Sequence, residues 1–447
     1  MTIVEHVGPT TPLPPTHHTA GLTSTAPEGA PSNRGTGTNR FVVVLAHEGV
    51  YGACSGSGFS NRTFITALAR MVPRGRLVVV PVLHTPGTPG HTPRWSQEME
   101  TLLSDAQAIV LPVDGASLLS TPSDLEVLCA KAVRRAAPYL RPGSLLIGCD
   151  VPFMAVGSYA APGVEILLIP RSSTLLTEPA AYEQIAWERR GMATAVQRGG
   201  WVAAISAHMR EHLAAACGVP ESAVMDLPNG LLLGEEDLKQ VTPPPLPAAA
   251  EDGFVLSFGR ALPSKGFEDL VKAFALLRLE GLPLPHLVLA AVASARWPTP
   301  HQRHLAGLLQ RHRVDATLLT RFDPAIRGWV TDTRMRALVV PSRREPFGRI
   351  PLECFAAGAG PVVATSAGGL ARTVVEGATG FSAPPEQPPA LAQALRRALA
   401  ATPADRARLA QAGTRLVVEH HNYASTIRKA VGRCAVWALT PHEGESP

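Results

Sequence analysis

Residues 343–358 have the sequence RREPFGRIPLECFAAG, and the fold can be worked out from this stretch. It follows residues 337–341, an apolar run that predicts a buried strand. A helix is expected over about 349–357, because Pro351 is tolerated in a first turn and Gly358 suits a helix end. A strand, a polar loop and a helix in this order indicate one repeat of an α/β fold.

Two carboxylates stand in this unit, Glu345 in the loop and Glu353 inside the helix, with seven residues between them. Between them lie backbone N–H groups at a helix start, which favour anions. Carboxylates accept hydrogen bonds from hydroxyls, whereas amides donate to phosphate. The pattern suits a ligand with hydroxyls at both ends and a pyrophosphate between them, such as a nucleotide sugar. The alternative is that both glutamates are helix-capping or surface residues.

The Glu-x7-Glu pattern, followed by Pro-Val-Val-Ala-Thr at 361–365 and by Gly368-Gly369, resembles the GT-B-fold retaining glycosyltransferases, family 4 in particular. The resemblance covers most of 40–437 and is stronger in the second half of the chain. It implies an α/β protein of GT-B architecture, in which two Rossmann-like doubly wound domains face each other across a cleft. It also implies sugar transfer with retention at the anomeric carbon.

Four segments are expected along the chain, with boundaries set by composition. Residues 1–39, rich in Thr, Pro, Gly and Ser, predict a disordered tail. An acceptor domain is expected at 40–241 and a nucleotide-sugar domain at 251–423, separated by the Pro-rich linker 242–250. The resemblance implies that the last helix, 424–440, crosses back to pack on the first domain.

The loop after the predicted strand 254–258 contains Gly259, Arg260 and Lys265. Two cations beside a helix start would clamp a diphosphate, although both could be solvated surface charges. The family carries Gly-Arg and then Lys-Gly here, so the resemblance makes Arg260 and Lys265 catalytic groups that stabilise the leaving diphosphate. Glu345 would bind sugar hydroxyls and is the third catalytic candidate.

The other donor-binding candidates come from three stretches. Residues 47–58 form a Gly- and Ser-rich loop before a helix expected at 61–71, as at the start of a nucleotide-binding unit, although such turns also serve packing alone. Glu353 would bind ribose hydroxyls. The resemblance adds the following residues near the base, diphosphate or sugar: Ser57, Gly58, Arg321, Phe347, Gly348, Arg349 and Ile350.

Acceptor-binding residues are expected at the carboxyl ends of strands in the first half, where ligands of α/β sheets bind. The candidates are Asp150 and Ser172, and the resemblance adds Asn61 at the start of the helix expected at 61–71. Many family members carry a histidine beside the reacting carbon at the end of the strand that here ends in Arg171. Arg171 is therefore the fourth catalytic candidate.

Composition narrows the class of protein. The 447 residues carry a net charge of +5 and no dense basic run, which argues against nucleic-acid binding. Six scattered cysteines without Cys-x-x-Cys spacing argue for a reducing, cytoplasmic setting. No run approaches the about 18 apolar residues of a membrane span, and no secretory signal is recognised. No Asp-x-Asp is found, so we expect neither a metal nor a cofactor.

The function expected from the sequence is transfer of a sugar from a UDP or GDP sugar to a small-molecule acceptor. The divergence of the first half suggests a specialised metabolite, such as an aminoglycoside-like or lincosamide-like intermediate. A homodimer is possible. The alternatives are a GT-B epimerase or phosphorylase, or a non-catalytic nucleotide-binding scaffold, which the missing histidine would fit.

Overall fold

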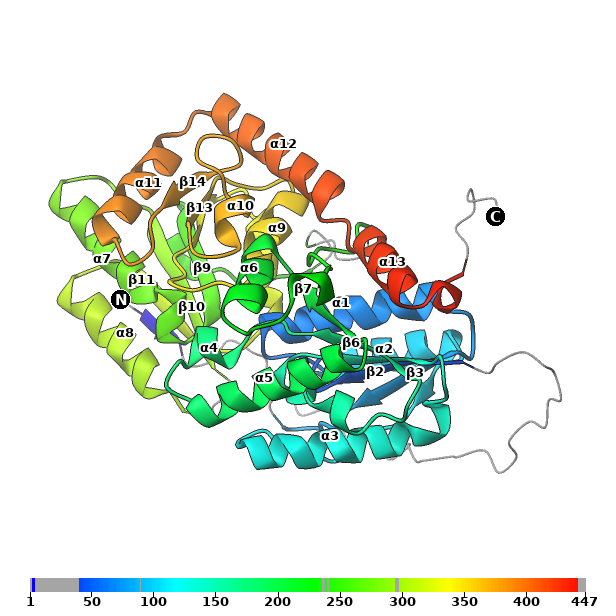
Figure 1. Cartoon of the computed structure of the whole chain (residues 1–447). Coiled ribbons are helices and arrows are strands. Elements are labelled where there is room, and N and C mark those ends of the chain that lie inside the picture. The colour runs from blue at the N-terminus through cyan, green and yellow to red at the C-terminus, as the bar shows by residue number, and fades with distance from the viewer. Residues whose placement is uncertain are drawn as a thin grey trace, which may run out of the picture.

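The computed structural model describes residues 2–4, 40–88, 90–234, 238, 241–293 and 297–440. Two α/β domains follow one another, each built on a seven-stranded sheet in which every strand pair is parallel (Figure 1). Helices cover the sheets, so the strands are continuous apolar runs rather than alternating ones. In Val42–Ala46, for example, all five residues are buried.

The sheet of the first domain has the strand order β4-β3-β2-β5-β6-β7-β8. Its strands are β2 (Val42–Ala46), β3 (Leu77–Pro81), β4 (Ile109–Val110), β5 (Leu145–Cys149), β6 (Glu165–Ile169), β7 (Trp201–Ala204) and β8 (Val224–Asp226). Its helices are α1 (Gly56–Met71), α2 (Pro93–Asp105), α3 (Pro122–Ala136), α4 (Thr174–Thr177), α5 (Tyr182–Gln197) and α6 (Ala207–Ala215). The order reverses between β2 and β5, which is where doubly wound sheets bind ligands.

The second sheet has the order β1-β11-β10-β9-β12-β13-β14 and reverses between β9 and β12. Its strands are β1 (Thr2–Val4), β9 (Phe254–Arg260), β10 (His286–Ala293), β11 (Ala316–Arg321), β12 (Met335–Val340), β13 (Val362–Thr365) and β14 (Phe381–Ala383). Its helices are α7 (Phe267–Leu279), α8 (Pro300–Arg311), α9 (Arg349–Ala356), α10 (Leu370–Thr373), α11 (Pro388–Ala400) and α12 (Pro403–His420). The predicted α/β class with two doubly wound domains is thus confirmed.

The prediction of a disordered tail over 1–39 is wrong for its first residues. Thr2–Val4 form the edge strand β1, which pairs in parallel with β11 of the second domain. The remainder of the predicted tail, residue 1 and residues 5–39, lies outside the described residues.

Helix α1 starts five residues before the position that we predicted, at Gly56 instead of Asn61. Ser55 is its N-cap, and the Ser55 hydroxyl accepts a hydrogen bond from the Gly58 N–H at 3.1 Å. The capping bond satisfies an N–H of the first turn, which lets the helix begin inside the glycine-rich loop.

Between residues 40 and 440 the chain crosses between the domains twice. The first crossing is the stretch 242–250, where the Pro244 carbonyl accepts a hydrogen bond from the Trp329 indole at 2.9 Å. The second leads from α12 to α13 (Tyr423–Cys434), which packs against α1, β6 and β8 of the first domain (Figure 1). The expected helix does not run on to residue 440, because α13 ends at Cys434 and a 3-10 turn follows at Val436–Ala438.

Candidate functional site

A cavity lies between the domains at the carboxyl ends of β9 and β10. It encloses about 620 Å³, open space included. The first domain contributes the loop before α1, and the second contributes the segment after β11 and the start of α9. The lining residues are Cys54, Ser55, Gly56, Phe59, Phe258, Gly259, Arg260, Ala290, Val292, Phe322, Asp323, Pro324, Ile326, Arg327, Arg349, Ile350 and Glu353.

Arg260 is the exposed cation of this first cavity, at the end of β9. No described residue forms an ion pair with it, so the guanidinium is available to an anion. Gly266 begins α7 with a φ of +66°, and a side chain at this position would collide with the Pro341 carbonyl. Glycine thus lets the loops that follow β9 and β12 touch at the switch point.

Lys265 and Glu345 form an ion pair of 2.6 Å across these two loops. Both side chains are mostly buried, at 20% and 14% exposure, so solvent screens the pair only in part. Ser342 also donates to Glu345, at 3.3 Å. The structure therefore brings together the lysine and the glutamate that we predicted to act on neighbouring parts of one donor.

Glu353 is held by two arginines at the wall of the first cavity. Arg349 Nε lies 2.8 Å from one carboxylate oxygen, and Arg327 reaches both oxygens at 2.8 and 2.9 Å. The Glu353 side chain is 5% exposed. The carboxylate that we predicted to accept ribose hydroxyls is thus already engaged in the free protein.

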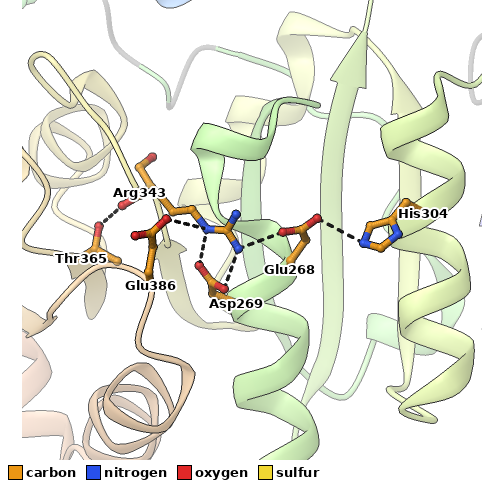
Figure 2. Close-up of polar contacts among 7 residues, drawn as sticks. Glu268, Asp269, His304, Arg343, Thr365 and Glu386 are labelled. Carbon is orange, nitrogen blue, oxygen red and sulfur yellow. Dashed lines mark hydrogen bonds and ion pairs between the residues drawn. The ribbon is translucent and has the colours of Figure 1, made fainter. Parts of the chain in front are cut away.

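Arg343 fixes the loop between β12 and α9 (Figure 2). Its guanidinium donates to Asp269 at 2.7 and 2.8 Å and to Glu268 at 2.8 Å, and its backbone N–H donates to the Ser264 carbonyl. Hydrogen bonds to Asp269 raise the pKa of Arg343 above its usual range. Glu268 also lies 3.2 Å from His304.

The two helix starts that we expected to bind a diphosphate differ in charge. Glu268 and Asp269 occupy the first turn of α7 and neutralise its positive end. Helix α9 has no acid in its first turn and begins at Gly348, whose φ is +93°. The start of α9 is therefore the better anion site of the two.

Arg171 is buried in a hydrogen-bond network that spans the first domain and α13. It is 4% exposed, and its guanidinium donates to Asn61 at 3.0 Å, to the Tyr423 hydroxyl at 2.6 Å, and to Asn229. These bonds join β6, α1, the turn after β8 and α13. Almost all N–H groups of Arg171 are used in this way and fasten α13 to the first domain. The catalytic role that we predicted for Arg171 stays a prediction.

The predicted acceptor residues do not line this cavity. Asn61 is completely buried beside Arg171. Asp150 is 6% exposed and accepts a hydrogen bond from its neighbour, the Val151 N–H, at a φ of +71°. The Ser172 hydroxyl is buried without a hydrogen-bond partner among the described residues. These three side chains are thus not gathered at the cleft.

Some of the predicted donor-binding residues do not line the first cavity either. The lining takes Ser55 and Gly56 in place of Ser57 and Gly58. Arg321 is exposed at the end of β11, and Phe322 and Asp323 line the cavity instead. Phe347 is buried and packs edge-on against His421, 5.7 Å between ring centroids.

Sequence reasoning missed the residues that close the first cavity across the domains. The Arg327 guanidinium lies 4.4 Å from the centroid of the Phe59 ring, and Phe59 lies 6.4 Å from Phe322. Arg327 belongs to a 3-10 segment, Pro324–Thr331, which no motif marked. The Asp-Pro pair at its start was the only available signal, and Asp323 caps the segment through the Ala325 N–H at 2.8 Å.

A second cavity, of about 580 Å³ with open space included, shares no lining residue with the first. Its lining consists of Leu176, Thr177, His208, Ser264, Arg343, Arg344, Glu345, Pro346 and Gly368. Glu345 thus faces this second space, whereas Arg260 and Glu353 face the first.

The cysteines and acidic residues provide little further chemistry. None of the six cysteines, which all lie in the described part of the chain, forms a disulfide, and burial raises the pKa of the Cys129 and Cys149 thiols to about 12. The described part of the chain holds no group of three potential metal ligands. None of its helices is long and apolar enough to cross a membrane.

Comparisons with known proteins find similarity to glycosyltransferases. The family model "Glycosyl transferases group 1" matches residues 239–416. D-inositol 3-phosphate glycosyltransferase from Jonesia denitrificans is 35% identical over 159 residues, 34% of this chain and 36% of that protein. The matched part thus spans about a third of that relative's length.

Solved structures show the same fold over most of the chain. Sucrose-phosphate synthase from Thermosynechococcus elongatus superimposes with a TM-score of 0.67 at 21% identity, covering 88% of this chain and 98% of that one. Anabaena HepE, crystallised with UDP-glucose, gives a TM-score of 0.64 at 18% identity over 88% and 99%. The two domains therefore have the GT-B arrangement.

Proposed function

Because residues 239–416 are a domain of the Glycosyl transferases group 1 family, we propose that this protein transfers a sugar from a nucleoside diphosphate sugar to a small-molecule acceptor. The observation that carries the proposal is the Lys265–Glu345 ion pair, which joins the loops after the neighbouring strands β9 and β12, with Arg260 at the end of β9. Arg260 faces the first cavity, which would suit the nucleotide, and Glu345 faces the second, which would suit the sugar.

The proposed chemistry depends on charge. As the bond between the anomeric carbon and the diphosphate breaks, negative charge grows on the leaving oxygen. Arg260, Lys265 and the first amides of α9 would stabilise it, and a metal would then not be required. Glu345 would hold the sugar hydroxyls. Retention at the anomeric carbon, and UDP or GDP as the nucleotide, are parts of the same proposal.

Glu353 would recognise the ribose only after a rearrangement. Its two oxygens are bound by Arg327 and Arg349, so at least one of these ion pairs must open before hydroxyls can take its place. Arg349 is part of α9 and stays near Glu353, whereas Arg327 lies on a separate 3-10 segment. Arg327 is therefore the partner that we expect to move.

Substitution of the central pair tests the proposal. Lys265→Ala and Glu345→Ala should each lower turnover of UDP-glucose or GDP-mannose by roughly 100-fold or more, as for loss of one charge-stabilising group in comparable sites. Released nucleoside diphosphate is the readout. Lys272→Ala, at an exposed position on α7, is the matched control. Equal rates in all three variants would refute the assignment.

A non-catalytic nucleotide-binding scaffold is a second candidate, because Arg171 is used structurally where many relatives carry a histidine. Calorimetry combined with turnover separates the two. A scaffold would bind UDP or GDP without consuming any sugar donor, whereas an epimerase or phosphorylase would consume the donor with no acceptor or with inorganic phosphate. A specialised-metabolite acceptor remains part of our proposal, supported by the divergent first half.

A further inference from the structure

The second cavity is lined by charged side chains beyond those to which the proposed function gives a role. Its lining comes from both domains, with Thr177 and His208 on one side and Ser264, Arg344 and Glu345 on the other. If the proposed function is right, Glu345 places the transferred sugar at this cavity. The remaining polar groups would then contact a substituent of that sugar or the incoming acceptor.

The one acid and one of the two arginines that line the second cavity are already held in ion pairs. Glu345, the one carboxylate among the lining residues, is paired with Lys265 at 2.6 Å. Arg343 is paired with Glu268 and Asp269, at 2.8 and 2.7 Å, and is likewise not available (Figure 2). The surplus charge of the cavity is therefore that of Arg344.

Arg344 is exposed, and the hydrogen bond that it donates is weak. One terminal nitrogen lies 3.3 Å from the Leu176 carbonyl, and none of the described carboxylates pairs with the guanidinium. His208 is also available, because no described side chain or backbone group is hydrogen-bonded to its ring. The ring stacks on that of His212, with 6.4 Å between the ring centroids. The Gly368 backbone approaches the same ring, so the imidazole lies against the cavity wall.

The start of α6 adds to the positive potential. His208 is in its first turn, which contains no acid. Ser206 caps the helix by accepting from the Met209 N–H at 3.0 Å, and its hydroxyl donates to the Pro346 carbonyl at 2.6 Å. The positive end of α6 is thereby fixed next to the loop that carries Arg344.

We propose that the second cavity binds an anionic group, a carboxylate or a phosphate monoester, with Arg344 and His208 as its direct ligands. The inference rests on the proposed function and narrows the substrate class. The anion belongs either to the acceptor, as in a phosphorylated polyol, or to the transferred sugar, as in a uronic acid. Both sources share the same chemistry and can be separated by experiment.

The test measures binding to the full chain by calorimetry. With UDP present at saturation, glucose 6-phosphate is compared with glucose for an anionic acceptor. Without UDP, UDP-glucuronate is compared with UDP-glucose for an anionic donor. We expect one anionic ligand of the two pairs to bind more tightly than its neutral analogue, and Arg344→Gln to weaken it roughly 10-fold or more.

Three further variants show whether the preference for the anionic ligand depends on Arg344 and His208. Arg344→Lys should retain part of the preference, His208→Gln should reduce it, and Arg372→Gln, at an exposed position on α10, should leave it unchanged. UDP affinity should stay within roughly twofold in all of them, because the first cavity is intact. If UDP binds but neither anionic ligand is preferred, or Arg344→Gln changes nothing, this inference fails alone. If neither UDP nor GDP binds, the proposed function fails with it.

Discussion

Arg171 combines full burial with the absence of a carboxylate among its hydrogen-bond partners. Its charge is satisfied by the neutral oxygens of Asn61, Asn229, Tyr423 and the Ser60 backbone. We predict that Arg171→Ala lowers the free energy of unfolding by about 3 kcal/mol or more, because four buried polar partners lose their donor. Chemical unfolding followed by circular dichroism would measure this loss.

The same substitution separates the two roles considered for Arg171. A structural residue changes stability and leaves UDP affinity nearly unchanged, whereas a catalytic residue changes turnover at constant stability. Arg171→Lys keeps the charge but loses the planar fork, so it should restore only part of the stability. Arg141→Ala, at an exposed position, is the control. Unaltered unfolding of Arg171→Ala would return the residue to the list of catalytic candidates.

Removal of the Arg327 guanidinium should strengthen nucleotide binding. It pairs with Glu353 at 2.8 Å, and the ribose must compete with this pair. We predict that Arg327→Gln tightens UDP binding roughly fivefold, equal to about 1 kcal/mol, which is the scale of a partly screened ion pair. Calorimetry with UDP gives the answer. Weaker binding would mean that Arg327 itself contacts the nucleotide.

The elements were easier to predict than their ends and their partners. The runs at 42–46 and 77–81 are continuously apolar, which is the pattern of strands covered on both faces. The strand β1 was missed because three apolar or β-branched residues within a Thr- and Pro-rich tail carry too little pattern. The start of α1 was missed because Ser55 competes as a cap with several serines and glycines around it.

In the candidate site, too, motifs predicted some residues, whereas their partners became visible only in the structure. Lys265 and Glu345 were recognised because motifs in two loops fall at neighbouring strand ends, and parallel topology brings such ends together. The pairing of Glu353 with Arg327 could not be read from the sequence, since it depends on the path of the chain after β11. The position of Arg171 was identified, but only packing around α13 reveals what it does.

Helix α6 contains a titratable group that should make stability depend on pH. Burial, together with the nearby charges of His208 and Arg189, lowers the pKa of His212 to about 4. His212 also lies 2.7 Å from the Ser173 hydroxyl, which precedes α4, and 3.5 Å from the Cys217 thiol. The neutral imidazole therefore links α6 to the chain before α4.

The sign of the pH effect follows from proton binding. Between pH 6.5 and about 4 the unfolded chain protonates this histidine and the folded protein does not. Stability is therefore intact above pH 6.5 and falls with pH by up to about 3 kcal/mol. His212→Asn should flatten this part of the profile, measured by unfolding at pH 7, 6 and 5. An unchanged slope in the variant would show that other groups cause the loss.

The two domains meet across the cleft through contacts of different strength. The second crossing of the chain is firmly attached to the first domain, because Leu231 and the residues around Asn422 exchange backbone hydrogen bonds of 3.0 and 3.1 Å. At the first cavity, by contrast, the domains meet through the stacking of Arg327 on Phe59. A nucleotide in this cavity would add new contacts to both sides.

We therefore predict that UDP protects both domains in hydrogen–deuterium exchange. Protection should appear in 54–59 of the first domain and in α9 of the second, because both line the first cavity. At 100 times its dissociation constant, UDP should also stabilise the protein by about 2.7 kcal/mol through mass action. In Phe59→Ala the protection of α9 should remain, and that of 54–59 should decrease, because the aromatic contact across the cleft is lost. Protection confined to the second domain of the unaltered protein would show that nucleotide binding does not couple the two halves.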